Sequence, residues 1–349
     1  MKISQTTHNI IFNDSRNLCD IGDETVDLIV TSPPYPMIKM WDDLFKKLNP
    51  NIIDSLDNND GQKTFELMNI ELDKVWNEVD RILKPNRFVC INIGDAARTI
   101  GDQFQLYSNH SRITSYFINA GYQPLPIIHW KKSTNKPNKF MGSGMLPAGA
   151  YVTLEHEYIL IFRKGGKRIF KTSSQKLLRN LSAFFWEERN KWFSDTWKLQ
   201  GIRQAINDSK TRKRNAAFPF ELAYRLINMY SVKGDIILDP FLGTGTTTFA
   251  AIAGERNSIG VEYDYNFGEL IKNGLINLKL EINESIISYR IENHIKFINE
   301  YEKTKRKPKY INSKYGFPVI TKQETKLSIN YICDIDYSKF PEIFVKYKN

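Results

Sequence analysis

The stretch Asp235-Ile-Ile-Leu-Asp-Pro-Phe-Leu-Gly-Thr-Gly-Thr-Thr-Thr248 decides the fold. Its beginning, three apolar residues between two aspartates, predicts a short buried strand, and the residues from Thr246 onward predict a helix. Gly243 and Gly245 stand between these elements and allow a sharp turn. A strand that enters a glycine turn and then a helix is typical of a parallel α/β unit, in which ligands bind at the carboxyl ends of the strands.

Hydrophobic periodicity predicts that strands and helices alternate along most of the chain. Strands are expected over 8–12, 26–30, 88–93, 125–130, 157–162, 235–239 and 258–262, and helices over 65–83, 111–120, 218–230, 246–254 and 265–305. Residues 37–64 show few periodic apolar positions and are expected to form a loop or an irregular insertion. Strand–helix–strand order with short connections predicts an α/β fold, Rossmann-like, with a mostly parallel, doubly wound sheet.

The chemistry of the glycine turn limits its ligand. No Gly-Lys-Ser/Thr follows the glycines, which argues against a nucleotide-hydrolysing loop, and Thr248 stands where a dinucleotide fingerprint has glycine or alanine. Asp239 and Glu262 end two successive strands, and the second acid can accept the hydroxyl groups of a ribose. S-adenosylmethionine combines a ribose with an amino group and a sulfonium, which suit these acids. The alternative is a turn that only lets a helix pack on the sheet.

The charge of the chain is unevenly distributed. The 349 residues include 49 Lys and Arg against 39 Asp and Glu, a net charge of +10. Residues 131–214 hold 19 basic against 6 acidic residues, whereas residues 1–130 hold 12 against 17. Aromatic residues are interleaved with cations at 184–193, a pattern that favours contact with nucleic acid over a merely solvated surface. Strand–helix alternation also stops over 167–214, which suggests a separate module.

The remaining composition excludes several classes of protein. The apolar fraction of 41% supports a substantial core. The sequence shows no apolar leader and no apolar run near the ~18 residues of a membrane span, so we expect a cytoplasmic protein. Cys19, Cys90 and Cys333 lack C-x-x-C spacing and are expected to be reduced and mostly buried. No metal-binding pattern is found among the cysteines and the 5 histidines, so no metal is expected.

Two motifs together resemble a known family. Thr31-Ser-Pro-Pro-Tyr35, which follows the strand at 26–30, and the glycine turn at 239–247 are similar to motifs of the DNA amino-methyltransferases of restriction–modification systems. The order of the motifs resembles the permuted β group, in which the catalytic motif precedes the cofactor motif. The resemblance covers most of residues 8–265. It implies S-adenosyl-L-methionine as cofactor, double-stranded DNA as substrate and a cognate restriction endonuclease, acting on the same site, as a partner.

The residues and the resemblance together assign a site. The expected catalytic residues are Ser32, Pro33, Pro34 and Tyr35. The expected cofactor-binding residues are Asp14, Phe218, Pro219, Asp239, Pro240, Phe241, Gly243, Gly245, Thr246 and Glu262. We expect four parts: 1–165, the catalytic half of the methyltransferase domain; 166–214, a target-recognition region; 215–275, the cofactor-binding half; and 276–349, a basic C-terminal extension. The oligomeric state stays open.

The catalytic motif has a chemical interpretation within this resemblance. The exocyclic amine of a base is a poor nucleophile because its lone pair is delocalised into the ring. Ser32 Oγ and the Pro33 carbonyl are expected to accept hydrogen bonds from both N–H groups and to aim the lone pair at the methyl carbon. Tyr35 is expected to stack on the base after it is flipped out of the duplex, which is worth roughly 1–3 kcal/mol. A simple strand cap would not require tyrosine.

Serine at position 32 bears on the choice of base. In the family that the chain resembles, Ser-Pro-Pro-Tyr is mostly found in enzymes that methylate cytosine at N4, and Asp-Pro-Pro-Tyr in those that methylate adenine at N6. Cytosine N4 is therefore expected, with adenine N6 as the alternative. Ring-carbon methylation is not expected, since no Pro-Cys pair occurs. RNA, a protein amide, or a non-catalytic nucleic-acid-binding role are further alternatives.

Overall fold

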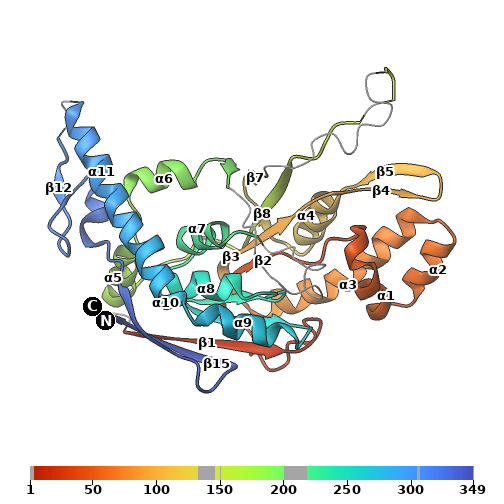
Figure 1. Cartoon of the computed structure of the whole chain (residues 1–349), viewed down its shortest axis with the longest axis horizontal. Coiled ribbons are helices and arrows are strands. Elements are labelled where there is room, and N and C mark those ends of the chain that lie inside the picture. The colour runs from red at the N-terminus through yellow and green to blue at the C-terminus, as the bar shows by residue number, and fades with distance from the viewer. Residues whose placement is uncertain (1–3, 133–145, 150, 200–217, 305–306, 349) are drawn as a thin grey trace.

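The computed structural model describes residues 4–132, 146–149, 151–199, 218–304 and 307–348. A large sheet crosses the molecule (Figure 1). From edge to edge it contains β14 (Tyr331–Asp336), β15 (Glu342–Lys348), β1 (Gln5–Phe12), β11 (Asn257–Glu262), β10 (Ile236–Asp239), β2 (Val26–Thr31), β3 (Leu83–Ile93), β8 (His156–Lys164), β7 (Ile128–Lys131) and β9 (Thr196–Lys198), with β6 (Gln123–Pro124) paired to β8. Two hairpins lie outside it, β4 (Ala96–Ile100) with β5 (Gln103–Tyr107) and β12 (Tyr310–Ile311) with β13 (Pro318–Val319).

The centre of the sheet is parallel. Strands β1, β11, β10, β2 and β3 all run in one direction, whereas β8 pairs with β3, and β15 with β1, in antiparallel fashion. The prediction of a mostly parallel α/β sheet is therefore confirmed for its central strands. Because the carboxyl ends of parallel strands meet at one edge, residues that follow β2, β3, β10 and β11 gather there.

Helices cover both faces of this sheet. The helices are α1 (Asp42–Leu48), α2 (Asn51–Asp57), α3 (Gly61–Ile82), α4 (Asn109–Asn119), α5 (Ser173–Leu181), α6 (Trp186–Trp192), α7 (Phe220–Tyr230), α8 (Thr246–Ala253), α9 (Phe267–Leu275), α10 (Leu278–Glu281) and α11 (Tyr289–Lys303). Short 3-10 turns lie at Lys39–Trp41 and Lys322–Lys326, and a π-helical segment at Ile282–Ser288 joins α10 to α11. None of the helices in the described ranges is both long and apolar enough to cross a bilayer.

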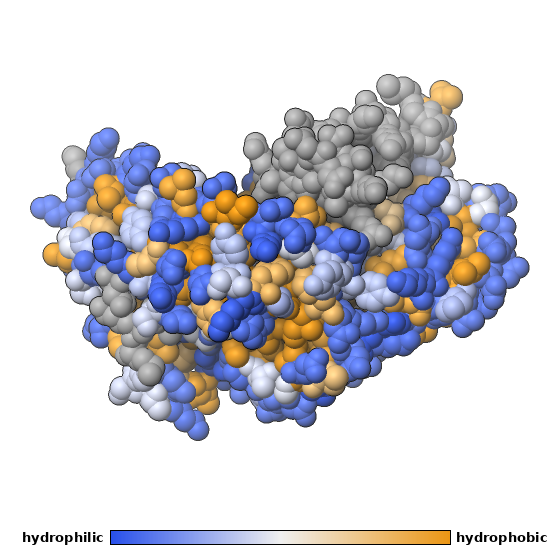
Figure 2. Space-filling model, turned by 60° about the horizontal axis from the view of Figure 1, so that its bottom comes forward, coloured by the Kyte–Doolittle hydropathy of each residue, from blue (hydrophilic) through white to orange (hydrophobic). Residues whose placement is uncertain are grey.

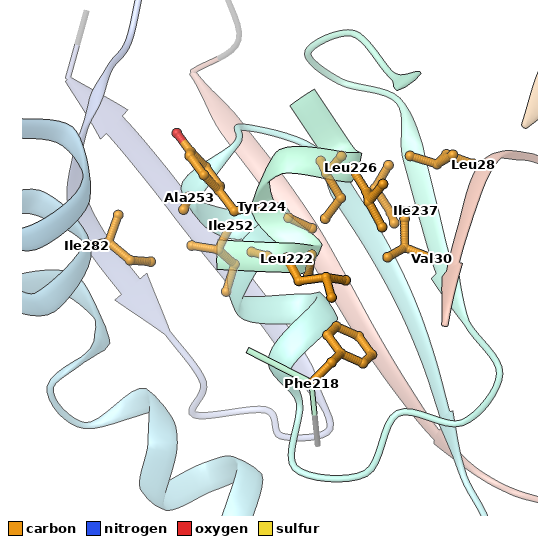
Figure 3. Packing of buried hydrophobic residues seen from close by; sticks show 14 of the residues in the cluster. Leu28, Val30, Phe218, Leu222, Tyr224, Leu226, Ile237, Ile252, Ala253 and Ile282 are labelled. Atoms are coloured by element: carbon orange, nitrogen blue, oxygen red, sulfur yellow. The ribbon is translucent and has the colours of Figure 1, made fainter. Parts of the chain in front are cut away.

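Successive side chains of β2 point to opposite faces of the sheet, which explains the layers of helices on both faces. Leu28 and Val30 belong to a core cluster with Leu222 of α7, whereas Ile29 belongs to a second cluster with Trp76 of α3. Figure 3 shows Leu222 of α7 among the side chains of the first cluster, between Leu226 and Phe218. These side chains are almost completely buried, and each aliphatic one contributes roughly 1.5–3 kcal/mol. A strand that is apolar on both sides thus holds helices on both faces.

The expectation of a loop over residues 37–64 is wrong. The segment contains α1 and α2, and α3 begins at Gly61, where the Asp60 side chain accepts a hydrogen bond from Lys63 N (3.0 Å). The two short helices bury few apolar side chains, chiefly Phe45 and Ile52. Helices that contribute one apolar anchor each leave no hydrophobic period in the sequence, which is why the pattern missed them.

All four predicted parts contribute strands to the one sheet. β9 belongs to the predicted target-recognition region and pairs in parallel with β7, and β14 and β15 belong to the C-terminal extension. The chain ends lie close together, since Tyr347 N donates to Ser4 O (3.0 Å). The suggestion that 167–214 forms a separate module is not supported by its described residues, because Phe185 and Trp197 lie in the main core.

The face in Figure 2 is mostly hydrophilic, with hydrophobic residues gathered near the centre of the view.

The exposure of the three cysteines differs from expectation. Cys90 is buried in β3, but Cys19 and Cys333 are exposed, so the expectation of mostly buried thiols is wrong. Cys19 lies in the turns before β2, and Cys333 lies on β14 at the end of the sheet, where one strand edge has no neighbour to cover it among the described strands.

Candidate active site

The two motifs meet at the carboxyl edge of the sheet. β2 and β10 are neighbouring parallel strands, with Leu28 opposite Ile237, so the segments that follow them leave the sheet side by side. The Thr31 hydroxyl donates a hydrogen bond to Asp239 Oδ1 (2.6 Å), a contact between positions 208 residues apart. The strand pairing therefore joins the proline motif directly to the glycine turn.

The glycine turn has the backbone that its sequence predicts. Gly243 (φ 56°) and Gly245 (φ 89°) both lie in the left-handed region, and Gly245 is the N-cap residue of α8. Gly243 N donates to Glu262 Oε2 (2.8 Å), which ties the turn to the end of β11. A Cβ atom at Gly243 would meet nothing within 4 Å. The turn thus presents bare backbone to open space.

A cavity of about 900 Å³ opens beside this turn. Ten of the predicted site residues line it: Asp14, Ser32, Pro33, Pro34, Phe218, Pro240, Phe241, Gly243, Thr246 and Glu262. The other four, Tyr35, Pro219, Asp239 and Gly245, are placed nearby by the structure but do not line this cavity. The volume is within the range of small-molecule sites, about 300–1,000 Å³. Residues of both motifs therefore line one cavity.

Glu262 fits the nucleoside part of the expected cofactor. Its Oε2 and Oε1 accept hydrogen bonds from Gly243 N and Asp264 N (both 2.8 Å). Each carboxylate oxygen has a further lone pair with which to accept a ribose hydroxyl. Burial raises the pKa of Glu262, against the effect of these two backbone donors. The Glu262 carboxylate, the bare glycine backbone and the aromatic ring of Phe241 suit S-adenosylmethionine. The contact of each residue with this cofactor stays a prediction.

Asp239 has structural partners that the sequence did not reveal. Its carboxylate is 1% exposed and accepts hydrogen bonds from Thr31 Oγ1 (2.6 Å), Thr247 Oγ1 (2.6 Å) and Phe241 N (3.0 Å). These donors lie on the proline motif, on α8 and on the turn itself. Asp239 therefore braces the turn against β2, and its predicted contact with the cofactor's amino group or sulfonium stays a prediction.

The buried charge of Asp239 predicts a pH-dependent stability. Burial raises the pKa of Asp239 from 3.8 to about 6, although the threonine and backbone hydrogen bonds act to lower it. Because the folded pKa exceeds the unfolded one, the stability that this group contributes is fully present below pH 3.8 and is lost as the pH rises through about 6. The loss corresponds to about 3 kcal/mol.

We expect the Asp239→Asn variant, which carries no buried charge, to become more stable relative to the wild type as the pH rises from about 4 to about 8. Urea unfolding of both proteins across this range measures the difference. The Asp235→Asn variant is the control, because Asp235 lies at the opposite end of β10 and is paired with Arg168. A wild-type/Asp239→Asn difference that does not change with pH would contradict the prediction.

Asp14 lies in the cavity wall, but its carboxylate is already paired. Arg16 donates to it through Nε (3.0 Å) and Nη2 (2.7 Å). Burial acts to raise the pKa of Asp14, but the hydrogen bonds and charge of Arg16 hold it below its usual value. Arg16 also bonds Glu71 of α3 (2.5 Å), and both residues line the cavity. The Asp-x-Arg spacing could have indicated Arg16, whereas nothing local could have indicated Glu71.

Behind the proline motif lies a polar network that the sequence reasoning missed. The Tyr35 hydroxyl donates to Glu157 Oε2 (2.9 Å), and Asn92 Nδ2 donates to the same oxygen (2.7 Å) and to the Tyr35 hydroxyl (2.8 Å). Ser32 Oγ lies 3.2 Å from the Tyr35 hydroxyl, and Lys132 Nζ donates to Glu157 Oε1. These groups come from the ends of different strands, so no linear motif contains them.

The Tyr35 ring is held against the backbone. A Cβ atom at Gly94 would lie 3.0 Å from Tyr35 Cε2, so a larger residue there would require the ring to move by a few tenths of an ångström. Burial and the negative charge of Glu157 raise the pKa of Tyr35, against the effect of the Ser32 hydrogen bond. The phenol is therefore protonated at neutral pH and donates to Glu157.

The basic segment, residues 131–214, does not lie wholly beside the cavity. Arg168 pairs with both oxygens of Asp235 (2.5 and 2.9 Å), just before β10, which places it at the amino edge of the sheet. α6 is held instead to α11, through Glu188 with Arg290 (2.6 and 2.7 Å). Residues 200–214 of the predicted target-recognition region, and residues 133–145 and 150 of the basic segment 131–214, lie outside the described residues.

Comparison with known proteins agrees with this geometry. A family described as DNA methylase matches residues 26–273. The chain is 53% identical over 347 residues to the type II methyltransferase M.MthZI of Methanothermobacter thermautotrophicus, covering 99% of this chain and 94% of that protein. It is 50% identical over 278 residues to the type II methyltransferase M.MjaI of Methanocaldococcus jannaschii, covering 76% and 90% respectively.

A solved structure has a similar fold. A Thermus thermophilus protein named as a DNA modification methylase was solved in complex with S-adenosyl-L-methionine. It is 30% identical to this chain, with a TM-score of 0.59 over 79% of this chain and 97% of that one. The likeness thus extends over nearly the whole of that protein.

Proposed function

Because this chain belongs to the DNA methylase family and is a type II DNA amino-methyltransferase with S-adenosyl-L-methionine as its cofactor, we propose that it methylates the exocyclic N4 amine of cytosine in a specific duplex sequence. We further propose that this methylation protects the site from a partner restriction endonuclease, and that the protein acts in the cytoplasm. The family and its relatives support an exocyclic amine as the target, and Ser32 supports cytosine as the base.

The observation that carries this proposal is the position of Ser32. It lines the same cavity as Gly243 and Glu262, the residues expected to hold the cofactor. When bound, the cofactor supplies a methyl group on a positively charged sulfur. An amine held at Ser32 would therefore meet the methyl group inside a shared cavity. Positioning of this kind is a large part of catalysis in transfer between two bound molecules.

The chain's own residues supply orientation and electrostatic stabilisation. The Ser32 hydroxyl oxygen and the Pro33 carbonyl accept hydrogen bonds from the amine, which concentrates its lone pair toward the methyl carbon. The prolines stiffen this edge because their φ angles are fixed. Tyr35 provides an aromatic face for a flipped base. Glu262, Gly243, Phe241 and Asp14 also line the cavity and are the residues that would hold the cofactor.

One experiment identifies the base. The wild-type protein is incubated with methyl-labelled S-adenosyl-L-methionine and duplex DNA of mixed sequence, and the DNA is digested to nucleosides and chromatographed. We expect the label in N4-methyl-2′-deoxycytidine. Label in N6-methyladenine would overturn the choice of base, and unlabelled DNA would overturn the proposed activity. Cofactor binding, measured separately by calorimetry, shows that the protein used is folded and competent.

A further inference from the structure

A continuous hydrogen-bonded path leads from the cavity into the protein. It begins at Ser32, which lines the cavity, and passes to the Tyr35 hydroxyl (3.2 Å) and then to Glu157 Oε2 (2.9 Å). Glu157 is 9% exposed and does not line the cavity. The path therefore runs from the expected position of the amine to a carboxylate that cannot reach the amine directly.

The neighbouring groups determine the direction of each hydrogen bond. The side-chain nitrogen of Asn92 is a donor only, and it donates to Glu157 Oε2 and to the Tyr35 oxygen. Glu157, as a carboxylate, only accepts, so the Tyr35 proton points toward it. The Tyr35 oxygen is then an acceptor for the Ser32 proton. Asn92 Nδ2 also lies 3.4 Å from Ser32 Oγ, which leaves one Ser32 lone pair for a substrate N–H. The Glu157 carboxylate thus fixes the order of donor to acceptor from Ser32 through Tyr35.

Methylation of an amine releases a proton that this path can take. The nitrogen lone pair forms the new N–C bond, the electrons of the C–S bond remain on sulfur, and the nitrogen becomes a cation with two protons. One N–H bond must then break, with its electrons staying on nitrogen. Resting on the function proposed above, we propose that Glu157 is the terminal acceptor of this proton, relayed by the Ser32 and Tyr35 hydroxyls, each of which receives one proton and passes on its own.

The surroundings of Glu157 suit this role. Lys132 Nζ donates to Oε1, the oxygen that the relay does not use, and so balances the carboxylate charge in the resting protein. The Lys132 side chain is 41% exposed, so this end of the path adjoins solvent, to which the proton is lost before the next turnover. A cationic nitrogen attached to an aromatic ring is strongly acidic, so a carboxylate at the end of the path can accept its proton.

The first test replaces the carboxylate with an amide of the same shape. For Glu157→Gln we expect the single-turnover methylation rate to fall by about 10²–10³-fold, because removal of a general base typically costs 10²–10⁴-fold. Cofactor and DNA affinities are expected to be unchanged. The control is Glu155→Gln, two residues away, 45% exposed and paired with Lys131, which is expected to keep the wild-type rate. A Glu157→Gln rate within about three-fold of the wild type would overturn the relay.

The second test separates proton transfer from a purely structural role. In Glu157→Ala, added formate is expected to restore part of the rate, whereas formamide at the same concentration and ionic strength is not. Rescue by both compounds, or by neither, would overturn the proposal. In addition, Tyr35→Phe/Glu157→Gln is expected to be no slower than the slower single variant, because both changes break the same path. If the wild type itself methylates no DNA, the proposed function fails instead.

Discussion

Replacing Tyr35 by alanine is expected to reduce methyl transfer to DNA by about 10³-fold or more, while S-adenosyl-L-methionine still binds. Two losses combine in this variant. The stacking surface for a flipped base, worth roughly 1–3 kcal/mol, is removed. The hydroxyl that bonds Glu157 and Asn92 is removed as well. Because Tyr35 does not line the cofactor cavity, binding of the cofactor has no reason to change.

The measurement is a single-turnover methylation assay beside calorimetric titration of the cofactor. Tyr35→Phe keeps the ring and lacks the hydroxyl, so it is expected to retain base flipping, which a fluorescent base analogue reports, while transfer is slow. Tyr116→Ala is the matched control, since Tyr116 lies on α4 and its hydroxyl donates to Asn77 of α3 (2.5 Å), away from the motif. Normal turnover by Tyr35→Ala would remove Tyr35 from the proposed mechanism.

The second large effect is expected at the glycine turn. Gly243→Val should weaken S-adenosyl-L-methionine binding by about 100-fold or more, equivalent to about 2.7 kcal/mol. At φ 56° a β-branched residue is strained, at a cost of about 1–3 kcal/mol. Its side chain would also enter the open space at the cavity wall and disturb the hydrogen bond from Gly243 N to Glu262. Both effects act on the residues expected to hold the cofactor.

Gly121→Val provides a matched control for this prediction. Gly121 also has a positive φ (84°), and a Cβ atom there would likewise meet nothing within 4 Å. It follows α4, outside the cavity wall, so the variant carries similar backbone strain without obstructing the site. Its stability to urea should fall while its cofactor affinity matches the wild type. Cofactor binding that is equally weakened in both variants would show that backbone strain alone lowers the affinity, and wild-type affinity in Gly243→Val would contradict the prediction.

The sequence predicted the fold and the part of the cavity wall that the two motifs form, because those features are encoded locally. A buried strand, a glycine turn and a helix occupy consecutive positions, so the run from Asp235 to Thr248 predicts its own conformation. The same holds for the strand that carries Thr31-Ser-Pro-Pro-Tyr35. Parallel strands deliver such motifs to one edge, and ten of the fourteen predicted site residues indeed line one cavity.

Other features were not predictable because they depend on contacts between distant segments. α1 and α2 are stabilised by single anchors, Phe45 and Ile52, that leave no period in the sequence. Asp239 is a conspicuous acid at the end of a strand, yet its carboxylate is occupied by Thr31 and Thr247. A sequence shows that an acid is present, but the partners that neutralise or bury it are chosen by packing.

By itself, therefore, the sequence determined the parallel α/β architecture, the two motifs and the chemistry of the cofactor that suits them, since each follows from neighbouring residues. Only the tertiary structure decided that β2 lies beside β10, so that Thr31 bonds Asp239. It alone brought Glu157 of β8 to the Tyr35 hydroxyl, 122 positions away. The physical reason is that hydrogen bonds act over about 3 Å, and strand pairing, not sequence spacing, determines which residues come that close.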